Sequence, residues 1–316
     1  MEYRKLISFG KSSFVVSLPK SWVMQNKLKK GDFIYFDESG SELVLQPRGE
    51  KVDEEKEKVI FVDGKTIARI GREVSAAYIM NYRQIVLKGA EIKNKIKDLQ
   101  LVIQNLIALE IMEQTSDTMV AKDFLNMDKV NLVELLRKMD VVTRTMFQES
   151  CKIFVEDNYD NINERDKDVN RLYFLLYRAS LYNMLNPMKA IKNLKMNMIE
   201  LLRIQNLGFY MEAIADEVRR TVRYVRLLKI VPAKQKEIET LLKKLNEYYL
   251  ETMKATHTKN IELALQLSEM KTTFDKELDL LEKDVQKVEN LNQVVNRIRR
   301  LVTVIHNLAR VVYTLV

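Results

Sequence analysis

The sequence from Glu164 to Arg171 reads ERDKDVNR, and the sequence from Glu212 to Arg219 reads EAIADEVR. Both follow one pattern: an acid, three residues, an aspartate, two residues and an arginine. On an α-helix, positions i, i+4 and i+7 lie on one face, so each copy presents two carboxylates and a guanidinium along one side. Two such helices packed side by side would bring four carboxylates together. Four carboxylates in one place repel one another, take up protons or hold a cation.

The long region that contains both stretches, from Asn126 to Val316, is predicted to be helical. Between Ala90 and the C-terminus the chain has a single glycine, Gly208, and two prolines, a composition typical of helices that are joined by short turns. Turn and capping residues break the region into six helices, which divide into two antiparallel three-helix bundles. The expected helices cover residues 129–155, 161–185, 188–230, 234–256, 261–287 and 291–315.

The chain before Asn126 has a different pattern. Residues 1–47 predict four short strands and a short helical piece after Pro19. This is too small a core to stand alone, so we expect the segment to share its core with a second copy. Residues 48–58 form a charged linker. In residues 59–125, strands and helices alternate, which predicts a small α/β domain.

The composition is that of an ordinary soluble protein. The 316 residues are 47% hydrophobic and 30% charged. No apolar run approaches the ~18–20 residues that a membrane span needs, and the N-terminus is not a signal peptide, so we expect a cytoplasmic protein without membrane insertion. With one cysteine and two histidines, no internal disulfide can form, and a metal would have to be held by carboxylates. The net charge of +8 fits contact with nucleic acid or with an acidic protein surface.

The sequence shows no catalytic arrangement. No nucleophile, base and third partner converge in any motif, and carboxylates without histidine or an evident pocket do not define a hydrolase. Gly10-Lys11-Ser12 is similar to the last three residues of a phosphate-binding loop. That loop needs a glycine five residues earlier, where Lys5 stands, and a long helix afterwards, which Pro19 prevents. We therefore expect a protein that is not an enzyme and has no organic cofactor.

The first segment contains four short runs whose order and spacing are informative. These runs are Ser8-Phe9-Gly10-Lys11-Ser12, Val16-Ser17-Leu18-Pro19-Lys20, Leu28-Lys29-Lys30-Gly31-Asp32 and Leu43-Val44-Leu45-Gln46-Pro47. In order and spacing they are similar to the swapped-hairpin domains of transition-state regulators and antitoxins, the AbrB/SpoVT type. The resemblance implies a homodimer with interleaved hairpins and a basic surface that grips DNA phosphates. The implied DNA contacts are Arg4, Lys5, Lys11, Lys20, Lys29 and Lys30.

The helical region resembles the phosphate-uptake regulators known as PhoU, in the form that carries an N-terminal swapped-hairpin domain. The resemblance lies in the run from Glu164 to Tyr173 and in the run from Met211 to Asp216. It implies two three-helix repeats, and binding of iron or another cation at the acidic motifs. The expected fold class is thus multidomain and mainly α, with a swapped-hairpin β-barrel half, a small α/β domain and a PhoU-like pair of three-helix bundles. The implied metal ligands are Glu164, Asp168, Glu212 and Asp216.

Alternatives stay open on the sequence alone. Asp168–Arg171 and Asp216–Arg219 are i, i+3 pairs, so the motifs can equally form a salt-bridge network, in which each pair is worth about 0.2–0.5 kcal/mol. The leading function is a non-enzymatic regulator that contacts DNA and senses phosphate status through a metal or a partner. In the alternative, the protein is an adaptor of a phosphate transporter or sensor kinase, and its β-domain only dimerises. A weaker idea is a metal-dependent phosphohydrolase that uses the same acids.

Overall fold

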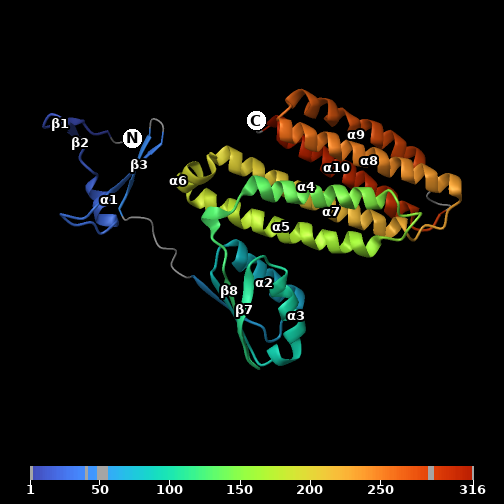
Figure 1. Cartoon of the computed structure of the whole chain (residues 1–316), viewed down its shortest axis with the longest axis horizontal. Helices are drawn as coiled ribbons and strands as arrows, with labels where there is room; N and C mark the ends of the chain where they lie inside the picture. The colour runs from blue at the N-terminus through green and yellow to red at the C-terminus, as the bar shows by residue number, and fades with distance from the viewer. Residues whose placement is uncertain (1–2, 40–41, 48–55, 284–287, 315–316) are drawn as a thin grey trace. The chain divides into compact units, whose positions relative to one another are not determined.

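The structure, a computed structural model, describes residues 3–39, 42–47, 56–283 and 288–314 (Figure 1). The chain divides into two compact units, Met1–Glu54 and Glu55–Val316. Each unit is treated by itself below. Most of the predicted charged linker, residues 48–58, lies outside the described residues.

The N-terminal unit contains the four short strands that its sequence predicts. Strands β1 (Ile7–Phe9) and β2 (Ser13–Val15) form an antiparallel hairpin, and Gly10 in its turn has a φ of +72°, a conformation that favours glycine. Helix α1 (Lys20–Gln25) follows Pro19, and β3 (Tyr35–Ser39) pairs antiparallel with β4 (Glu42–Gln46). None of the residues whose burial is described in this unit is buried. The residues of this unit whose burial is described therefore form no core of their own, as its size predicts.

The second unit begins with the α/β domain. Its elements are β5 (Glu57–Phe61), α2 (Ile67–Ile79), β6 (Gln84–Lys88), α3 (Ile92–Gln104), β7 (Leu109–Gln114) and β8 (Thr118–Asp123), which give the predicted combination of strands and helices. The sheet order is β5-β6-β8-β7, with β5 and β6 parallel and the other pairs antiparallel. Both helices lie on one face of the sheet (Figure 1). Alternate strand residues, such as Ile85, Leu87 and Ala121, are buried in its core, because strand side chains alternate between the two faces.

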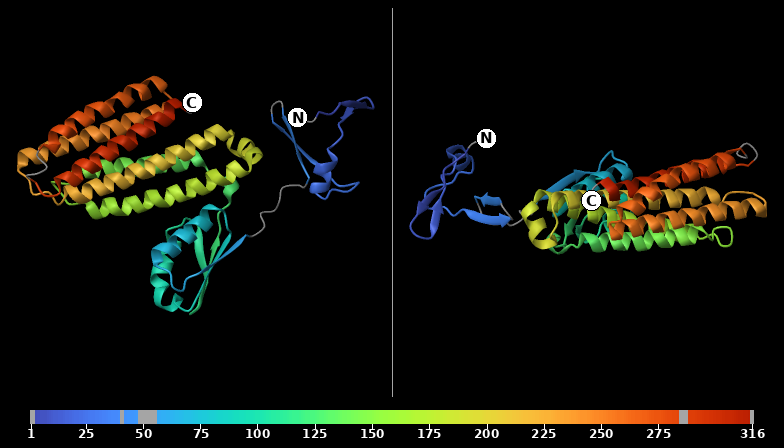
Figure 2. Two further views of the ribbon diagram at one scale, coloured as in Figure 1. Left: turned by 180° about the vertical axis from the view of Figure 1, so that it is seen from behind. Right: turned by 90° about the horizontal axis from the view of Figure 1, so that it is seen from above.

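The helical region has the predicted two groups of three long helices. The first group is α4 (Leu132–Ser150), α5 (Tyr159–Leu185) and α7 (Met198–Val225), and the second is α8 (Pro232–Thr258), α9 (Ile261–Glu282) and α10 (Leu291–Thr314). The groups meet where α7 packs on α10 and α4 packs on α8. Viewed from behind, α5, α7 and α10 lie in a row (Figure 2, left). One continuous apolar core runs through both groups.

One predicted helix, 188–230, is interrupted near its start, so that part of the prediction is wrong. After a single turn, α6 (Pro187–Lys189), the chain forms a π-helical turn over Ala190–Leu194 and then Lys195 adopts a left-handed conformation with φ 55°. Helix α7 begins only at Met198, after a capping box in which Asn197 and Glu200 bond each other's backbone N–H groups. No glycine or proline marks this break, and its sequence signal is the capping box of Asn197 and Glu200, which the prediction did not use.

A buried ion pair joins the α/β domain to the helical region. The guanidinium of Arg178, on α5, donates to both carboxylate oxygens of Asp123, at the end of β8, over 3.0 and 2.7 Å. It also donates to the Asn81 side-chain oxygen over 2.7 Å and lies 4.4 Å from the centre of the Tyr78 ring. Both side chains of the Arg178–Asp123 pair are fully buried. Such a pair fixes the α/β domain on α5 at one point.

We expect Arg178→Met to lower the free energy of unfolding by about 3–5 kcal/mol, because it leaves the Asp123 carboxylate buried with an incomplete set of partners. Chemical denaturation followed by far-UV circular dichroism measures the change. The matched control is Arg137→Met on α4, whose exposed side chain forms no ion pair with any described residue. Equal stabilities of the two variants would contradict the role given to the pair.

Candidate functional site

The two predicted ligands on α5 lie on an exposed face. The side chain of Glu164 is 67% exposed and pairs with Lys167 over 2.6 Å. The side chain of Asp168 is 58% exposed, and its nearest cation is Arg171, at 3.8 Å. Neither acid contacts α7 in any described ion pair or hydrogen bond. The two carboxylates therefore belong to the solvent-facing side of the helix.

The two predicted ligands on α7 lie in a different environment. Asp216 accepts from Arg219 over 2.5 Å and pairs with Arg220 over 2.6 Å. The acid of α5 that meets this group is Asp166, which lies 2.9 Å from Nε of Arg219. Asp166 is two residues from each predicted ligand of α5, and two residues turn a helix through about 200°. The sequence pattern thus places the wrong face of α5 toward α7.

The ion pairs continue from α7 to α10 and form what we call the charge chain. Arg220 also donates to Glu217 over 3.0 Å. Glu217, whose side chain is 2% exposed, in turn contacts Nε of Arg300 at 3.0 Å and Nη1 of Arg297 at 3.5 Å. The charge chain runs across the row of α5, α7 and α10 seen in Figure 2, so it connects the two helix groups. Its members, in order, are Asp166, Arg219, Asp216, Arg220, Glu217 and the pair Arg297 and Arg300.

Glu212 lies beside the charge chain without joining it. Its carboxyl makes no hydrogen bond or ion pair with any residue in the described part of the chain. The pKa of Glu212 is raised to about 7, mainly by burial and also by the negative charges of Asp216 and Asp166, while Arg220 and Arg219 act in the opposite direction. Burial also raises the pKa of Asp166, although Arg219 opposes the shift. Glu212 is therefore the acid in this region that changes charge near neutral pH.

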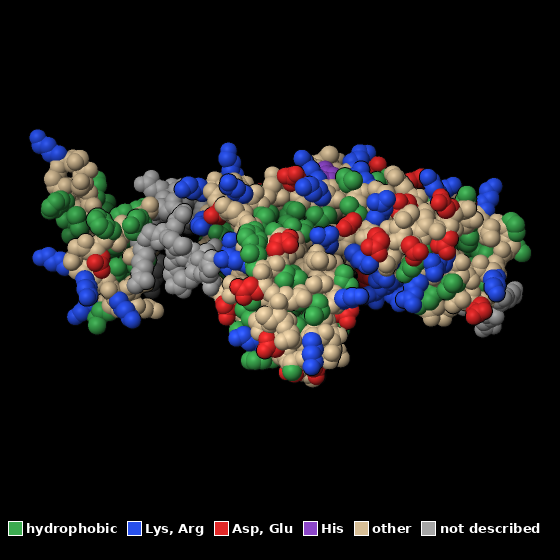
Figure 3. All heavy atoms as spheres, turned by 60° about the horizontal axis from the view of Figure 1, so that its bottom comes forward, with side chains coloured by type: hydrophobic (Ala, Val, Ile, Leu, Met, Phe, Trp, Pro, Cys, Tyr) green, Lys and Arg blue, Asp and Glu red, His purple; other side chains and the backbone are tan. Residues whose placement is uncertain are grey.

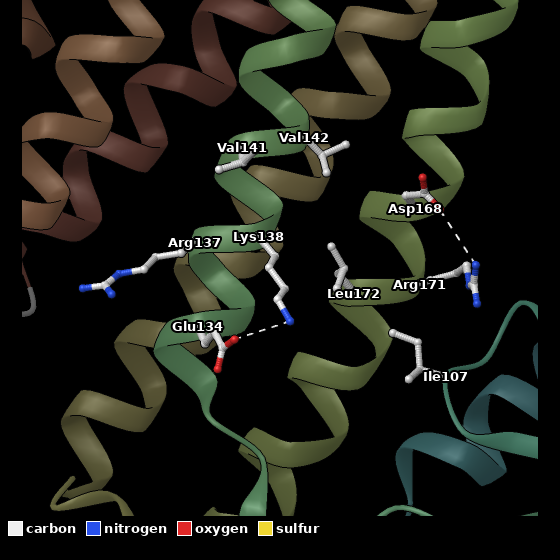
Figure 4. A pocket seen from close by; sticks show the side chains of 9 residues that line it. All are labelled: Ile107, Glu134, Arg137, Lys138, Val141, Val142, Asp168, Arg171 and Leu172. Carbon is white, nitrogen blue, oxygen red and sulfur yellow. Dashed lines mark ion pairs between the residues drawn. The ribbon is translucent and has the colours of Figure 1, made fainter.

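A groove of about 630 Å³ lies between α4 and α5, and Ile107 of the α/β domain contributes to it (Figure 4). Its floor is mainly apolar, and its edge carries two ion pairs, Glu134–Lys138 at 3.5 Å and Asp168–Arg171 at 3.8 Å. Both pairs are exposed, so they contribute little stability. The volume is in the range of small-molecule pockets. Sequence reasoning missed this groove because its wall comes from two domains. The lining residues are Ile107, Glu134, Arg137, Lys138, Val141, Val142, Asp168, Arg171 and Leu172.

This architecture was compared with known proteins. No family model and no curated protein matches the chain. Among solved structures, PhoU from Pseudomonas aeruginosa is similar, with a TM-score of 0.52 and 15% sequence identity over 58% of this chain and 94% of that one. The helical region has a PhoU-like fold. At this identity the likeness concerns the fold alone, and the predicted AbrB/SpoVT domain lies outside what it shows.

In the PhoU-like region the predicted metal ligands do not fit a metal site as they are arranged. Within the described residues, no three histidine, cysteine or acidic side chains are grouped so that they could hold a metal ion. Arginines stand next to Asp166 and Asp216, where a cation would have to bind. The salt-bridge alternative describes this geometry. Binding of iron or another cation stays a prediction, which elemental analysis of the purified protein tests.

The basic residues of the N-terminal unit are accessible. All six predicted DNA contacts are exposed. Figure 3 shows basic and hydrophobic side chains together on the surface of this unit. The six residues are Arg4, Lys5, Lys11, Lys20, Lys29 and Lys30.

None of the described helices of the chain is both long and apolar enough to cross a membrane.

We expect Glu212→Gln to stabilise the protein increasingly as the pH rises from about 4.5 to about 7 and by a constant amount above that. A carboxyl with a raised pKa in the folded state binds its proton more tightly there, so the wild type loses stability across this window, by at most about 1.4 kcal/mol per pH unit. The measurement is the free energy of unfolding of both proteins between pH 4.5 and 8.

Glu164→Gln is the matched control, because it makes the same chemical change on the exposed face of α5. It should alter stability by less than about 0.5 kcal/mol. A Glu212→Gln effect that is the same at every pH would argue against the raised pKa.

Proposed function

We propose that the protein is a non-enzymatic regulator of phosphate uptake. The observation that supports this most is the pair of three-helix bundles, which together have the fold of PhoU. The helical region would act by contact with a partner, such as a component of a phosphate transporter or its sensor kinase. We place this activity in the cytoplasm, consistent with the lack of a membrane-spanning helix among the described ones. The proposed mechanism requires no catalytic residue and no organic cofactor.

We further propose that the protein is a homodimer through its N-terminal unit. Large apolar side chains of this unit face solvent, among them Phe9 at 71%, Phe14 at 69% and Phe33 at 81% exposure. Leaving so many large apolar groups in water is unfavourable, and a second copy of the same unit would bury them. The likeness of this segment to swapped-hairpin domains leads to the same proposal. Sedimentation equilibrium of the full chain measures the oligomeric state.

Contact with DNA is the proposed task of the paired N-terminal units. The exposed lysines and arginines of two copies would form one basic surface that suits the phosphate backbone. In the adaptor alternative, the same unit only holds two copies together. The helical region would sense phosphate status in the first case and would dock on a transporter or kinase in the second. Binding of DNA distinguishes the two.

The main proposal is tested by phosphate uptake of cells with and without the gene, after growth in scarce and in excess phosphate. We expect the deletion strain to keep a high uptake rate in excess phosphate, because the regulator that reports sufficiency is missing. Expression of the wild-type chain should restore the decrease. If uptake in the deletion strain still falls with excess phosphate as in the parent, the protein is not such a regulator.

For DNA contact, we expect the full chain to retard duplex DNA in a gel, with an affinity that decreases steeply with salt concentration. Lys29→Glu with Lys30→Glu should weaken binding at least about tenfold, because two phosphate contacts are replaced by repulsion in each copy. The matched control is Lys236→Glu with Lys243→Glu, an equal change of charge at exposed positions of α8. Absence of retardation at low salt, with the dimer intact, would favour the adaptor.

A further inference from the structure

The connection between α5 and α7 forms one end of the helical region, at α6 (Figure 1), and carries several exposed apolar side chains. We call residues 185–202 the tip. Leu185 is 70% exposed and Ile199 is 60% exposed. Three further side chains of the tip, Ile191, Met198 and Leu202, are more than two-fifths exposed. These five side chains come from the end of α5, the π-helical turn and the start of α7.

The backbone of the tip explains why these groups face outward. Lys195 is left-handed, and the capping box of Asn197 and Glu200 starts α7 abruptly. Because α7 begins at Met198, the side chains of Met198 and Ile199 belong to its first turn, beyond the buried positions that start at Leu201. A helix continuous from α6 would have given these residues a different direction. The interruption thus produces the exposed apolar end.

The charge of the tip is strongly one-sided. Between Asn186 and Ile199 the chain contains three lysines and no acidic residue. Lys192 and Lys195 are exposed. Lys189 is half-buried, donates to the Tyr182 hydroxyl over 3.0 Å and pairs with the Asp128 carboxylate at 3.5 Å. Glu200, the one acid among residues 185–202, accepts a hydrogen bond from the backbone of Asn197, so the exposed aliphatic side chains are flanked by an excess of positive charge.

We propose that the tip binds an anionic phospholipid surface. Aliphatic side chains that enter the interfacial layer and lysines that pair with acidic headgroups are the two contributions that hold peripheral proteins on such surfaces. The tip carries exposed aliphatic side chains and exposed lysines in the same connection between α5 and α7. Binding of this kind is peripheral, since α5 and α7 stay in the helical bundle and the described helices cannot span a bilayer.

A lipid surface fits the tip better than an acidic partner helix does. Amphipathic helices bind in grooves, where their apolar side can be covered from both flanks. The exposed apolar residues of the tip belong to a connection between two helices, and Figure 1 shows that this connection, at α6, protrudes at one end of the helical region. A protruding, basic and apolar surface suits a flat layer whose headgroups can rearrange around it. The chemistry of the occupant is thus acidic headgroups over hydrocarbon.

The test is co-sedimentation of the full chain with vesicles of phosphatidylcholine alone or of equal parts phosphatidylcholine and phosphatidylglycerol. We expect binding to the mixed vesicles at least about tenfold tighter than to the neutral ones, with weakening by salt. Lys192→Glu with Lys195→Glu, and separately Ile199→Gln with Leu202→Gln, should each reduce binding to mixed vesicles at least about tenfold. All four positions are exposed, so the variants should keep the wild-type far-UV circular dichroism spectrum.

Each tip variant has a matched control elsewhere on the helical region. Lys236→Glu with Lys243→Glu repeats the charge change on α8, and Leu265→Gln with Met270→Gln repeats the loss of exposed apolar groups on α9. The controls should bind mixed vesicles as the wild type does. Equal loss in tip variants and controls, or no binding to mixed vesicles, would overturn the proposal. So would tip variants that change the oligomeric state in solution, because the tip would then be an interface between copies.

Discussion

The pairing of Arg178 with Asp123 determines how the parts of the larger unit are joined. Two charges removed from water are tolerated only when each has its partner in good geometry, so α5 and the end of β8 must meet at this one register. The same stretch of α5 is fixed on its other side by close packing. A Cβ atom on Gly208 of α7 would lie 2.1 Å from a methyl group of Leu176. The α/β domain, α5 and α7 are therefore held together within about one helical turn.

The same device recurs at each junction between the rigid parts of this unit. Asp140 of α4, which is 4% exposed, accepts from Arg144 of its own helix and from the Tyr249 hydroxyl of α8 over 3.0 Å. Glu217 does so where α7 meets α10. Each of these buried acids thus has one partner on its own side of a junction, which is Arg83 for Asp123, and another partner across the junction. Polar pairing of this kind specifies one arrangement, while the continuous apolar core supplies most of the stability.

The sequence predicted most of the fold because its local signals agree with one another. Alternating apolar residues marked the strands of the α/β domain, and the absence of glycine, together with capping residues, marked the long helices. The break before Met198 has neither a glycine nor a proline, and the prediction missed its one sequence signal, the capping box of Asn197 and Glu200. Arg178 could not be recognised from the sequence either. It lies within a helix among polar and apolar neighbours, and its partner Asp123 is 55 residues away in the chain.

The acidic motifs show where periodicity stops being informative. Their spacing indicated correctly which residues share a face of one helix, but it contains nothing about how two helices are rotated against each other. That rotation follows from the apolar residues of α5 and α7, and it brings Asp166 rather than Glu164 or Asp168 to the contact. Asp216 is then neutralised by two arginines. Glu212 forms no ion pair with any described residue, and its pKa is raised to about 7. The charge of the contact between α5 and α7 is therefore set by the one motif acid that the ion pairs leave out.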